Sequence, residues 1–310
     1  MNSKGRLYSY HRHDIEILEK HFDLKVVRWS RKFTMSVPEI ISLLRHGRDA
    51  DFIISFFPQF HSVVSSILAK TLNIPHFIVY GIAPKEEKSL MVKLTDFLFL
   101  NDSKQIKELS NAFGISEDKM IVVHREFDYN YFTGNEKKER FVLSVGNNYH
   151  RKGIDRIIAV AENLPDVRFV VIGLKKPFDE IPSNIEFKGL VPQNELLEYY
   201  KKAKVYLQLT RWDAVPNALI EAMLCECIPI ATRDGLWGCG WDLPFDISGY
   251  VIDKKQFNDT DYLCRIVKES IDSENNERKL NEARKECIKR FGTPIREKNL
   301  VEAIKSKIKE

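Results

Sequence analysis

Short apolar runs alternate with helix-like segments through the first part of the chain. The helix-like segments include HDIEILEKHF (13–22), VPEIISLLRHG (37–47), HSVVSSILAKTLN (61–73) and SKQIKELSNAFG (103–114). The apolar runs are typical of strands, and they are RLYSY (6–10), LKVVRW (24–29), DFIISFF (51–57), HFIVYG (76–81), DFLFLND (96–102) and KMIVVH (119–124). This alternation predicts a parallel sheet that is covered by helices on both faces.

A polar and charged segment, TGNEKKER (133–140), interrupts the alternation and is typical of a linker. The pattern then resumes, with helices at 155–164, 194–203 and 218–226 and strands FVLSVG (141–146), RFVVIG (168–173), IEFKG (185–189), VYLQL (205–209) and IPIAT (228–232). We therefore expect an α/β protein of two doubly wound, Rossmann-like domains, one over residues 1–135 and one over 136–310. The amphipathic last helix either stays in the second domain or packs back on the first.

Composition narrows the class of protein. A chain of 310 residues with 44% hydrophobic side chains can build more than one core. The net charge of +4 argues against a nucleic-acid partner recruited by charge. No apolar run reaches the length of about 18 residues that a membrane span needs, and the N-terminus has no signal-peptide core. The odd count of cysteines, five, predicts free thiols, so we expect a cytoplasmic protein.

In such a fold, ligands bind beyond the carboxyl ends of the strands, and with two domains the natural place is the cleft that they face. The loop in VGNNYHRKGID (145–155) follows a predicted strand that ends at Gly146. It carries Asn147, His150, Arg151 and Lys152 before a glycine and a helix. Backbone amides and cations gathered there suit a phosphate or diphosphate, although a solvated basic loop is an equal alternative.

A second stretch, TRWDAVPNALIEAM (210–223), places two acids around a proline. Pro216 suits the first position of a helix, so the amides of Asn217 and Ala218 lie at the positive end of the helix dipole and suit a phosphate. Asp213 precedes the helix, and Glu221 lies about one turn inside it, where its carboxylate can accept hydrogen bonds from two vicinal hydroxyls of a ribose. Taken singly, Asp213 is better explained as a helix-start charge and Glu221 as an exposed helical acid.

Together these stretches resemble the family-4 retaining glycosyltransferases of the GT-B fold, in glycosyltransferase group 1. The likeness runs through the second domain in order, in VLSVG…RKGID, RFVVIG, IEFKGLVPQNELLEYYKKAKVYLQLT, DAVPNALIEAM and CIPIAT. DAVPNALIEAM resembles the family's motif of two acids separated by seven residues. The first domain resembles the family more weakly, in DKMIVVHREFDYNYF (118–132).

The resemblance implies a role for each matching position. It implies that Glu221 binds the nucleotide ribose and that Asp213 lies near the transferred sugar and the leaving phosphate. The phosphate contacts fall on Gly146, Asn147, Arg151 and Lys152 and on the helix start at Pro216, Asn217 and Ala218, and the contacts to the base fall on Leu190 and Val191. The family's first acid is usually glutamate, so Asp213 is one methylene shorter, and its usual arginine is Asn147 here.

The implied reaction moves a sugar from a nucleoside-diphosphate sugar, with UDP or GDP as the nucleotide, to a hydroxyl of a glycan, a lipid-linked or a small-molecule acceptor. Catalysis would come mainly from Lys152, Arg151 and the helix-start amides stabilising the leaving phosphate. We expect no cofactor, because the nucleotide sugar is a substrate, and no metal. Two D-x-D strings, Asp49–Asp51 and Asp259–Asp261, are predicted to open a strand and to cap a helix.

The N-terminal half offers two weaker features. His11 and His13 either contact the acceptor or cap the following helix. RWSRKFTM (28–35) combines basic and aromatic residues, which suits either peripheral contact with the inner face of a membrane or a solvated loop. Two other functions stay open, a non-catalytic protein that binds nucleotide sugars and a nucleotide-sugar epimerase.

Overall fold

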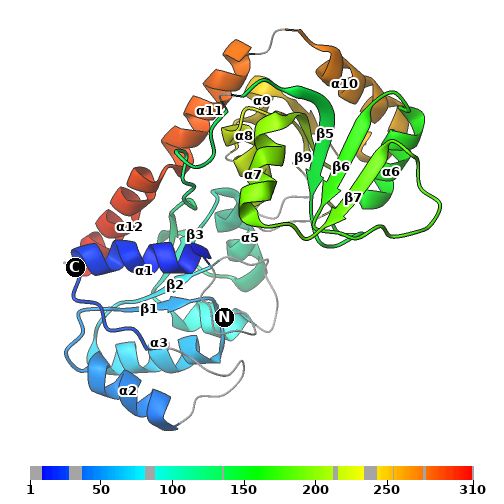
Figure 1. Ribbon diagram of the computed structural model, residues 1–310. Coiled ribbons are helices and arrows are strands. Elements are labelled where there is room, and N and C mark those ends of the chain that lie inside the picture. The colour runs from blue at the N-terminus through cyan, green and yellow to red at the C-terminus, as the bar shows by residue number, and fades with distance from the viewer. Residues whose placement is uncertain are drawn as a thin grey trace. The chain divides into compact units, whose positions relative to one another are not determined.

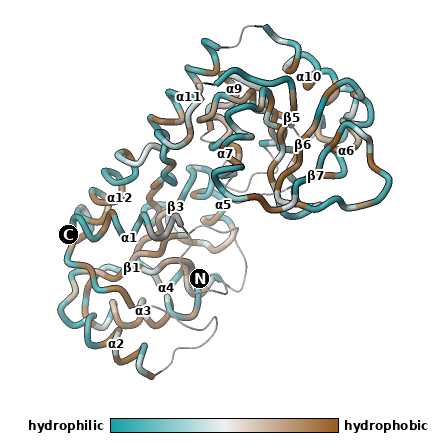
Figure 2. The backbone as a smooth tube through the Cα atoms, in the orientation of Figure 1, coloured by the Kyte–Doolittle hydropathy of each residue, from teal (hydrophilic) through white to brown (hydrophobic). Residues whose placement is uncertain are grey.

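The computed structural model describes residues 9–27, 37–80, 88–134, 136–211, 216–233, 243–253, 255–274 and 277–308. The described chain forms two compact units, unit 1 with Met1–Glu126 and Thr293–Glu310, and unit 2 with Phe127–Gly292. Each unit contains a parallel sheet, so the predicted α/β class is confirmed (Figure 1). In Figure 2 the hydrophobic colouring follows the strands, as at β1 and β6.

Unit 1 is built on a four-stranded sheet in the order β1-β2-β3-β4, with every neighbouring pair parallel. Its strands are β1 (Ile53–Phe56), β2 (His76–Val79), β3 (Phe97–Leu100) and β4 (Met120–Val122), and its helices are α1 (Ser9–His21), α2 (Val37–Gly47), α3 (Phe60–Leu72), α4 (Ser89–Leu94), α5 (Lys104–Phe113) and α12 (Thr293–Ile308), with a 3-10 turn η2 (Glu117–Lys119). Side chains of α1 and α12 pack against one face of the sheet and those of α4 and α5 against the other.

Two strands predicted in unit 1 are wrong in the part that the structure describes. Ser9 and Tyr10, the end of the predicted strand RLYSY, begin the helix α1, and Leu24–Val27 of LKVVRW form no regular element. The reason lies in the packing of α1, because its Ile17 and Leu18 are buried against the sheet. An apolar run that covers a sheet cannot be told from one that enters it by composition alone.

Unit 2 is built on a six-stranded parallel sheet in the order β10-β9-β8-β5-β6-β7. Its strands are β5 (Glu139–Val145), β6 (Arg168–Ile172), β7 (Ile185–Gly189), β8 (Ala203–Gln208), β9 (Ile228–Thr232) and β10 (Tyr250–Ile252), and its helices are α6 (Ile154–Asn163), α7 (Gln193–Lys202), α8 (Asn217–Leu224), α9 (Phe245–Ser248), α10 (Thr260–Asp272) and α11 (Glu277–Phe291), with a 3-10 turn η3 (Gln256–Asn258). This is the strand order of a dinucleotide-binding Rossmann sheet, and helices cover both faces.

The structure divides the chain nine residues earlier than position 135, between Glu126 and Phe127. Phe127 and Phe132 account for this, because both are buried in the core of unit 2, and the amide of Phe127 donates to the carbonyl of Phe291 at 2.8 Å. The chain returns to unit 1 at Thr293, and α12 lies beside α1 (Figure 1).

Buried ion pairing fixes α12 in unit 1. The guanidinium of Arg296 donates to both carboxylate oxygens of Asp14 in α1, at 2.6 and 2.9 Å, and both side chains are buried. It also donates to the carbonyls of Val123 and His124, at 3.0 and 2.5 Å. One arginine thus joins three segments of the unit that are distant in sequence: helix α1, the residues that follow β4, and helix α12.

Candidate functional site

The strand order of unit 2 reverses between β5 and β8. These strands are neighbours in the sheet, but the chain leaves β5 towards β6 and β7 and returns to β8 on the other side. A parallel doubly wound sheet binds ligands at such a reversal, beyond the carboxyl ends of the two strands, because the loops that follow them diverge there. The loop 146–153 after β5 and the segment 209–216 after β8 are the two stretches singled out in the sequence.

The loop after β5 is shaped by its own hydrogen bonds. The amide of Gly146 donates to the carbonyl of Ile172 at 2.8 Å, and the amides of Arg151 and Lys152 donate to the Oδ1 and carbonyl oxygen of Asn148, at 2.8 and 3.0 Å. Asn147 is exposed. The loop ends at Gly153, which has a φ of 64°. A Cβ atom on Gly153 would lie 1.8 Å from the carbonyl oxygen of Leu209, so only glycine allows this close approach.

The two loops are joined by hydrogen bonds. The amide of Arg211 and the hydroxyl of Thr210 both donate to the carbonyl of Arg151, at 2.8 and 2.9 Å. The Arg211 guanidinium donates to the carbonyl of His150 at 2.6 Å and to both carboxylate oxygens of Asp155, at 2.8 and 2.5 Å. Burial raises the pKa of Asp155, but the Arg211 guanidinium, together with Arg156 and a backbone hydrogen bond, more than offsets this, and the pKa lies below its ordinary value. Neither Arg211 nor Asp155 is among the site residues predicted from the sequence.

The predicted phosphate-binding lysine packs against the end of β5. Only 9% of Lys152 is exposed. A Cβ atom added to Gly146 would lie 2.5 Å from Cγ of Lys152, so the absence of a side chain at Gly146 makes room for the stem of the lysine. The structure thus brings Gly146 and Lys152 together, as their proposed joint contact with a phosphate requires.

Helix α8 begins on the same edge of the sheet. The amides of Leu219 and Ile220 donate to the carbonyl of Pro216, at 2.9 and 3.2 Å. The amides of Asn217 and Ala218, the first two of the helix, precede this intrahelical ladder and lie at the positive end of the dipole. The Oδ1 atom of Asn217 is buried without a hydrogen-bond partner in the part of the chain that the structure describes.

Glu221 lies one turn further along α8, half-buried. Burial raises the pKa of its carboxyl group, and the hydroxyl of Tyr200, on α7, opposes part of that rise. Asp213, its partner in the sequence motif, lies outside the described residues.

The residues predicted to contact the base follow β7. Gly189 donates its amide to the carbonyl of Leu174 at 3.0 Å, and its own carbonyl accepts from the amide of Gly173 at 2.6 Å. Gly173, at a φ of 98°, approaches Gly146 closely, because a Cβ there would lie 2.8 Å from the Gly146 carbonyl oxygen. Leu190 is 86% exposed and Val191 is half-buried. The ends of β5, β6 and β7 are thus in contact.

The predicted acceptor-side histidines lie in α1 of unit 1. Nδ1 of His13, an exposed residue, lies 2.8 Å from Oε1 of Glu126, whose side chain is buried. The side chain of His11 and the whole stretch 28–35 lie outside the described residues. Asp259 caps α10, since its Oδ1 accepts from the amide of Tyr262 at 2.9 Å, as predicted.

The described ranges contain neither a candidate metal site nor a candidate membrane-spanning helix. Within them, three or more histidine, cysteine, aspartate or glutamate side chains do not come together in a way that could hold a metal ion. Among the helices in the same ranges, none has the length and hydropathy needed to cross a membrane.

Comparison with known proteins places these features in a family. Residues 129–286 match the model of the family described as "Glycosyl transferases group 1". The chain is 31% identical over 106 residues, 30% of its length, to an α-galactosylglucosyldiacylglycerol synthase of Streptococcus pneumoniae, of which the match spans 28%. It is 26% identical over 262 residues, 76% of its length, to an uncharacterized glycosyltransferase of Methanocaldococcus jannaschii, of which the match spans 69%.

A solved structure shares the fold over nearly the whole chain. The crystal structure of HepE from Anabaena, in complex with UDP and glucose, superposes with a TM-score of 0.75 at 13% identity and covers 97% of each chain. The expected GT-B type of α/β fold is therefore confirmed.

Proposed function

Because this chain belongs to the group 1 glycosyl transferases, we propose that unit 2 binds a nucleoside-diphosphate sugar and that the protein transfers its sugar to a hydroxyl with retention of configuration. The bond between the anomeric carbon and the phosphate oxygen breaks, and a bond to the acceptor oxygen replaces it. The acceptor proton leaves with the diphosphate product. UDP is our first candidate for the nucleotide, since the Anabaena relative was solved with UDP.

The observation that carries this proposal is the joining of the two loops at the β5–β8 reversal. Arg211 fixes the loop that bears Arg151 and Lys152 against the segment that leads into α8. A diphosphate there would meet the ammonium of Lys152 and the first amides of α8, and its developing negative charge would be stabilised by both. Glu221, deeper in the same helix, would accept hydrogen bonds from the ribose.

The acceptor and the metal requirement are also proposals. The relative from S. pneumoniae is named as a synthase of a diacylglycerol glycolipid, which supports a lipid-linked acceptor over a free sugar. We propose metal-independent transfer, with cationic side chains and helix amides in place of a divalent ion. Strict dependence of transfer on added magnesium, measured against excess chelator, would contradict this part.

Replacement of Glu221 by alanine tests the donor site. Thermal shift against UDP-, GDP- and ADP-sugars identifies the nucleotide, since a ligand at 100 times its dissociation constant adds about 2.7 kcal/mol to folding stability. E221A should then bind that nucleotide at least about 10-fold more weakly, because a charged hydrogen-bond acceptor is lost. E198A, which removes an exposed glutamate of α7, is the matched control. Equal affinity of E221A and wild type would refute the donor site.

A non-catalytic nucleotide-sugar-binding protein is the second candidate. It is favoured by one observation, the aspartate at position 213 where the family resemblance implies a longer glutamate. Donor turnover separates the two, because a binding protein would shift in melting temperature with the donor yet release no nucleotide. The anomeric configuration of a transferred sugar, read by NMR, decides between retention and inversion.

A further inference from the structure

Three polar atoms on α7, β8 and α8 of unit 2 are buried without a hydrogen-bond partner in the described chain. They are the hydroxyl of Tyr200 on α7, Nε2 of Gln208 at the end of β8 and Oδ1 of Asn217 at the start of α8. Buried polar groups are nearly always paired in folded proteins, so each of these needs an explanation. A group that pairs only when a ligand is bound is one such explanation.

Of these three residues, Tyr200 belongs to the buried core that also contains Leu219, Ile220 and Ala222, the residues around Glu221 on α8. The two groups affect each other's ionisation, because burial and then the charge of Glu221 raise the pKa of Tyr200, while the Tyr200 hydroxyl lowers that of Glu221. The hydroxyl nevertheless makes no hydrogen bond of ordinary geometry in the described structure.

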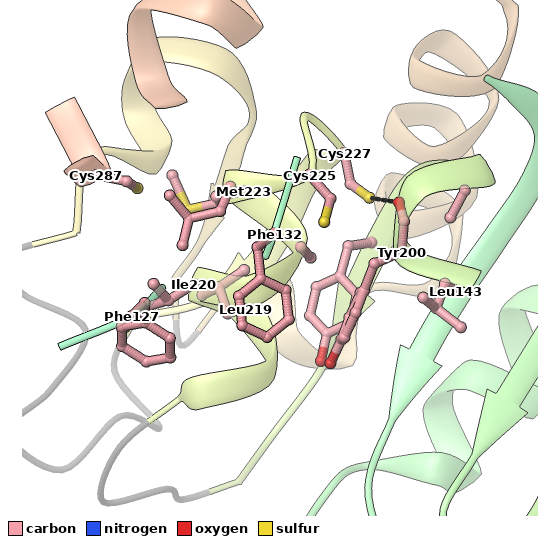
Figure 3. Close-up of a cluster of buried hydrophobic side chains, with 14 of the residues drawn as sticks. Phe127, Phe132, Leu143, Tyr200, Leu219, Ile220, Met223, Cys225, Cys227 and Cys287 are labelled. Atoms are coloured by element: carbon pink, nitrogen blue, oxygen red, sulfur yellow. Dashed lines mark hydrogen bonds between the residues drawn. The ribbon is translucent and has the colours of Figure 1, made fainter. Parts of the chain in front are cut away.

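The packing around Tyr200 holds its ring in place. Its backbone carbonyl accepts from Sγ of Cys227 at 3.1 Å and from Nζ of Lys138 at 3.3 Å. The ring lies among buried aromatic side chains, 6.4 Å from that of Phe132 and 6.1 Å from that of Tyr206. Figure 3 shows the Tyr200 hydroxyl at the far end of the residue from the backbone carbonyl that accepts from Cys227.

The hydroxyl of the neighbouring Tyr206 already donates a hydrogen bond. Tyr206 donates to Oε1 of Gln208 at 3.3 Å, so it does not compete for the carboxylate through that proton. The Tyr200 proton has no such acceptor among the described residues. Of the two tyrosines, Tyr200 is therefore the available donor to Glu221.

We propose that Tyr200 is a positioning residue of the nucleotide site, whose hydroxyl donates a hydrogen bond to the Glu221 carboxylate and orients it towards the ribose hydroxyls. This inference rests on the proposed function, which supplies the ribose. A donor beside a buried carboxylate favours its ionised form, which is the form that accepts two hydroxyl protons. Removal of the Tyr200 hydroxyl should therefore weaken ribose binding without loosening the core.

The test compares Y200F with wild type in the binding of UDP and GDP and of their 2′,3′-dideoxy forms, by calorimetry. For the nucleotide that wild type binds, Y200F should bind about 10-fold more weakly, which is about 1.4 kcal/mol. The dideoxy form, which lacks the hydroxyls that Glu221 would hold, should bind equally to both proteins. The unliganded melting temperature of Y200F should not fall, because the variant removes a buried hydroxyl that has no partner.

Y199F is the matched control, since it removes a hydroxyl from the preceding residue of α7, whose ring packs on Phe141 at 6.5 Å. It should bind both forms like wild type. Unchanged ribonucleotide affinity in Y200F, or an equal loss for the dideoxy form, would overturn the positioning role while leaving the donor site in place. Failure of wild type to bind either nucleotide would overturn the proposed function, and this inference with it.

Discussion

Two residues of the same type and backbone conformation can be constrained by different contacts in this chain. Gly114 and Gly153 have the same backbone conformation, with a φ of 64° in each. A Cβ on Gly114 would meet nothing within 4 Å, whereas one on Gly153 would meet the carbonyl oxygen of Leu209 at 1.8 Å. The first glycine serves only the left-handed turn after α5, and the second also lets the two loops of the candidate site approach.

Alanine at these two positions should separate the two effects. G114A should lose about 1 kcal/mol of unfolding free energy, the cost of the left-handed conformation alone. G153A should lose clearly more, and its nucleotide affinity should fall, because the loop must move away from Leu209. Urea unfolding and nucleotide titration of both variants provide the measurement. An equal loss of stability in both would show that the close approach carries no cost.

A buried histidine makes unit 1 sensitive to acid. Nε2 of His76 lies 2.9 Å from Oγ of Ser55, and Nδ1 lies 2.8 Å from Oγ of Ser66. Ser66 uses its own proton on the carbonyl of Ser62, so Nδ1 carries the hydrogen and Nε2 accepts. Burial, and next the charge of His61, lower the pKa of His76 from 6.5 to about 3. The folded state thus holds the neutral ring.

The sign of the pH effect follows from this shift. Between pH 6.5 and about 3 the unfolded chain binds a proton that folded His76 does not, so stability falls as the pH falls. From pH 7.5 to 5.0, His76 alone should remove about 2 kcal/mol of unfolding free energy. Urea midpoints of wild type and H76Q at both pH values test this. The variant is less stable at pH 7.5 but should lose less on acidification, and an identical loss would contradict the prediction.

At the scale of elements, the strand pattern of unit 2 was predictable from sequence and the joining of its loops was not. Each apolar run predicted there is a strand, and most of β5, β6, β8 and β9 is buried on both faces and therefore reads as a continuous apolar stretch. The pairing of Arg211 with Asp155 depends on β8 lying next to β5, which only the strand order provides. The three-residue strand β10 was too short to predict from its apolar content.

The geometry of the Arg211–Asp155 pair yields an element-scale prediction. R211K keeps the positive charge but cannot donate in parallel to both carboxylate oxygens and to the carbonyl of His150. Nucleotide affinity should fall several-fold, because the loop of Lys152 is no longer fixed to the segment that leads into α8. R168K, which alters the exposed pair with Glu186, should bind nucleotide like wild type. Equal affinities of R211K and wild type would show that the two loops hold their positions without the pair.

At the scale of the whole molecule, the chain passes between its units twice, and the last helix returns to the unit where the chain began. From the sequence alone that helix could pack in either domain, because its Lys/Glu-rich amphipathic pattern fits any apolar surface. Leu300, Val301 and Ile304 pack on the core of unit 1, and Arg296 reaches Asp14 from 282 positions away. Any other placement of α12 would leave the buried carboxylate of Asp14 without its cation, which is strongly destabilising.

Replacement of Arg296 by methionine should therefore destabilise unit 1 alone. R296M leaves the buried carboxylate of Asp14 without its cation and should cost about 3–5 kcal/mol of unfolding free energy. The double variant D14L/R296M removes both charges and should recover part of that loss, though the carbonyls of Val123 and His124 still lose a donor.

Hydrogen exchange read by mass spectrometry locates the effect. Peptides of β1–β4, α1 and α12 should lose protection in R296M, while those of β5–β9 should keep it, because the core of unit 2 contains neither residue. Loss of protection in both units, to the same extent, would mean that the two fold as one cooperative body.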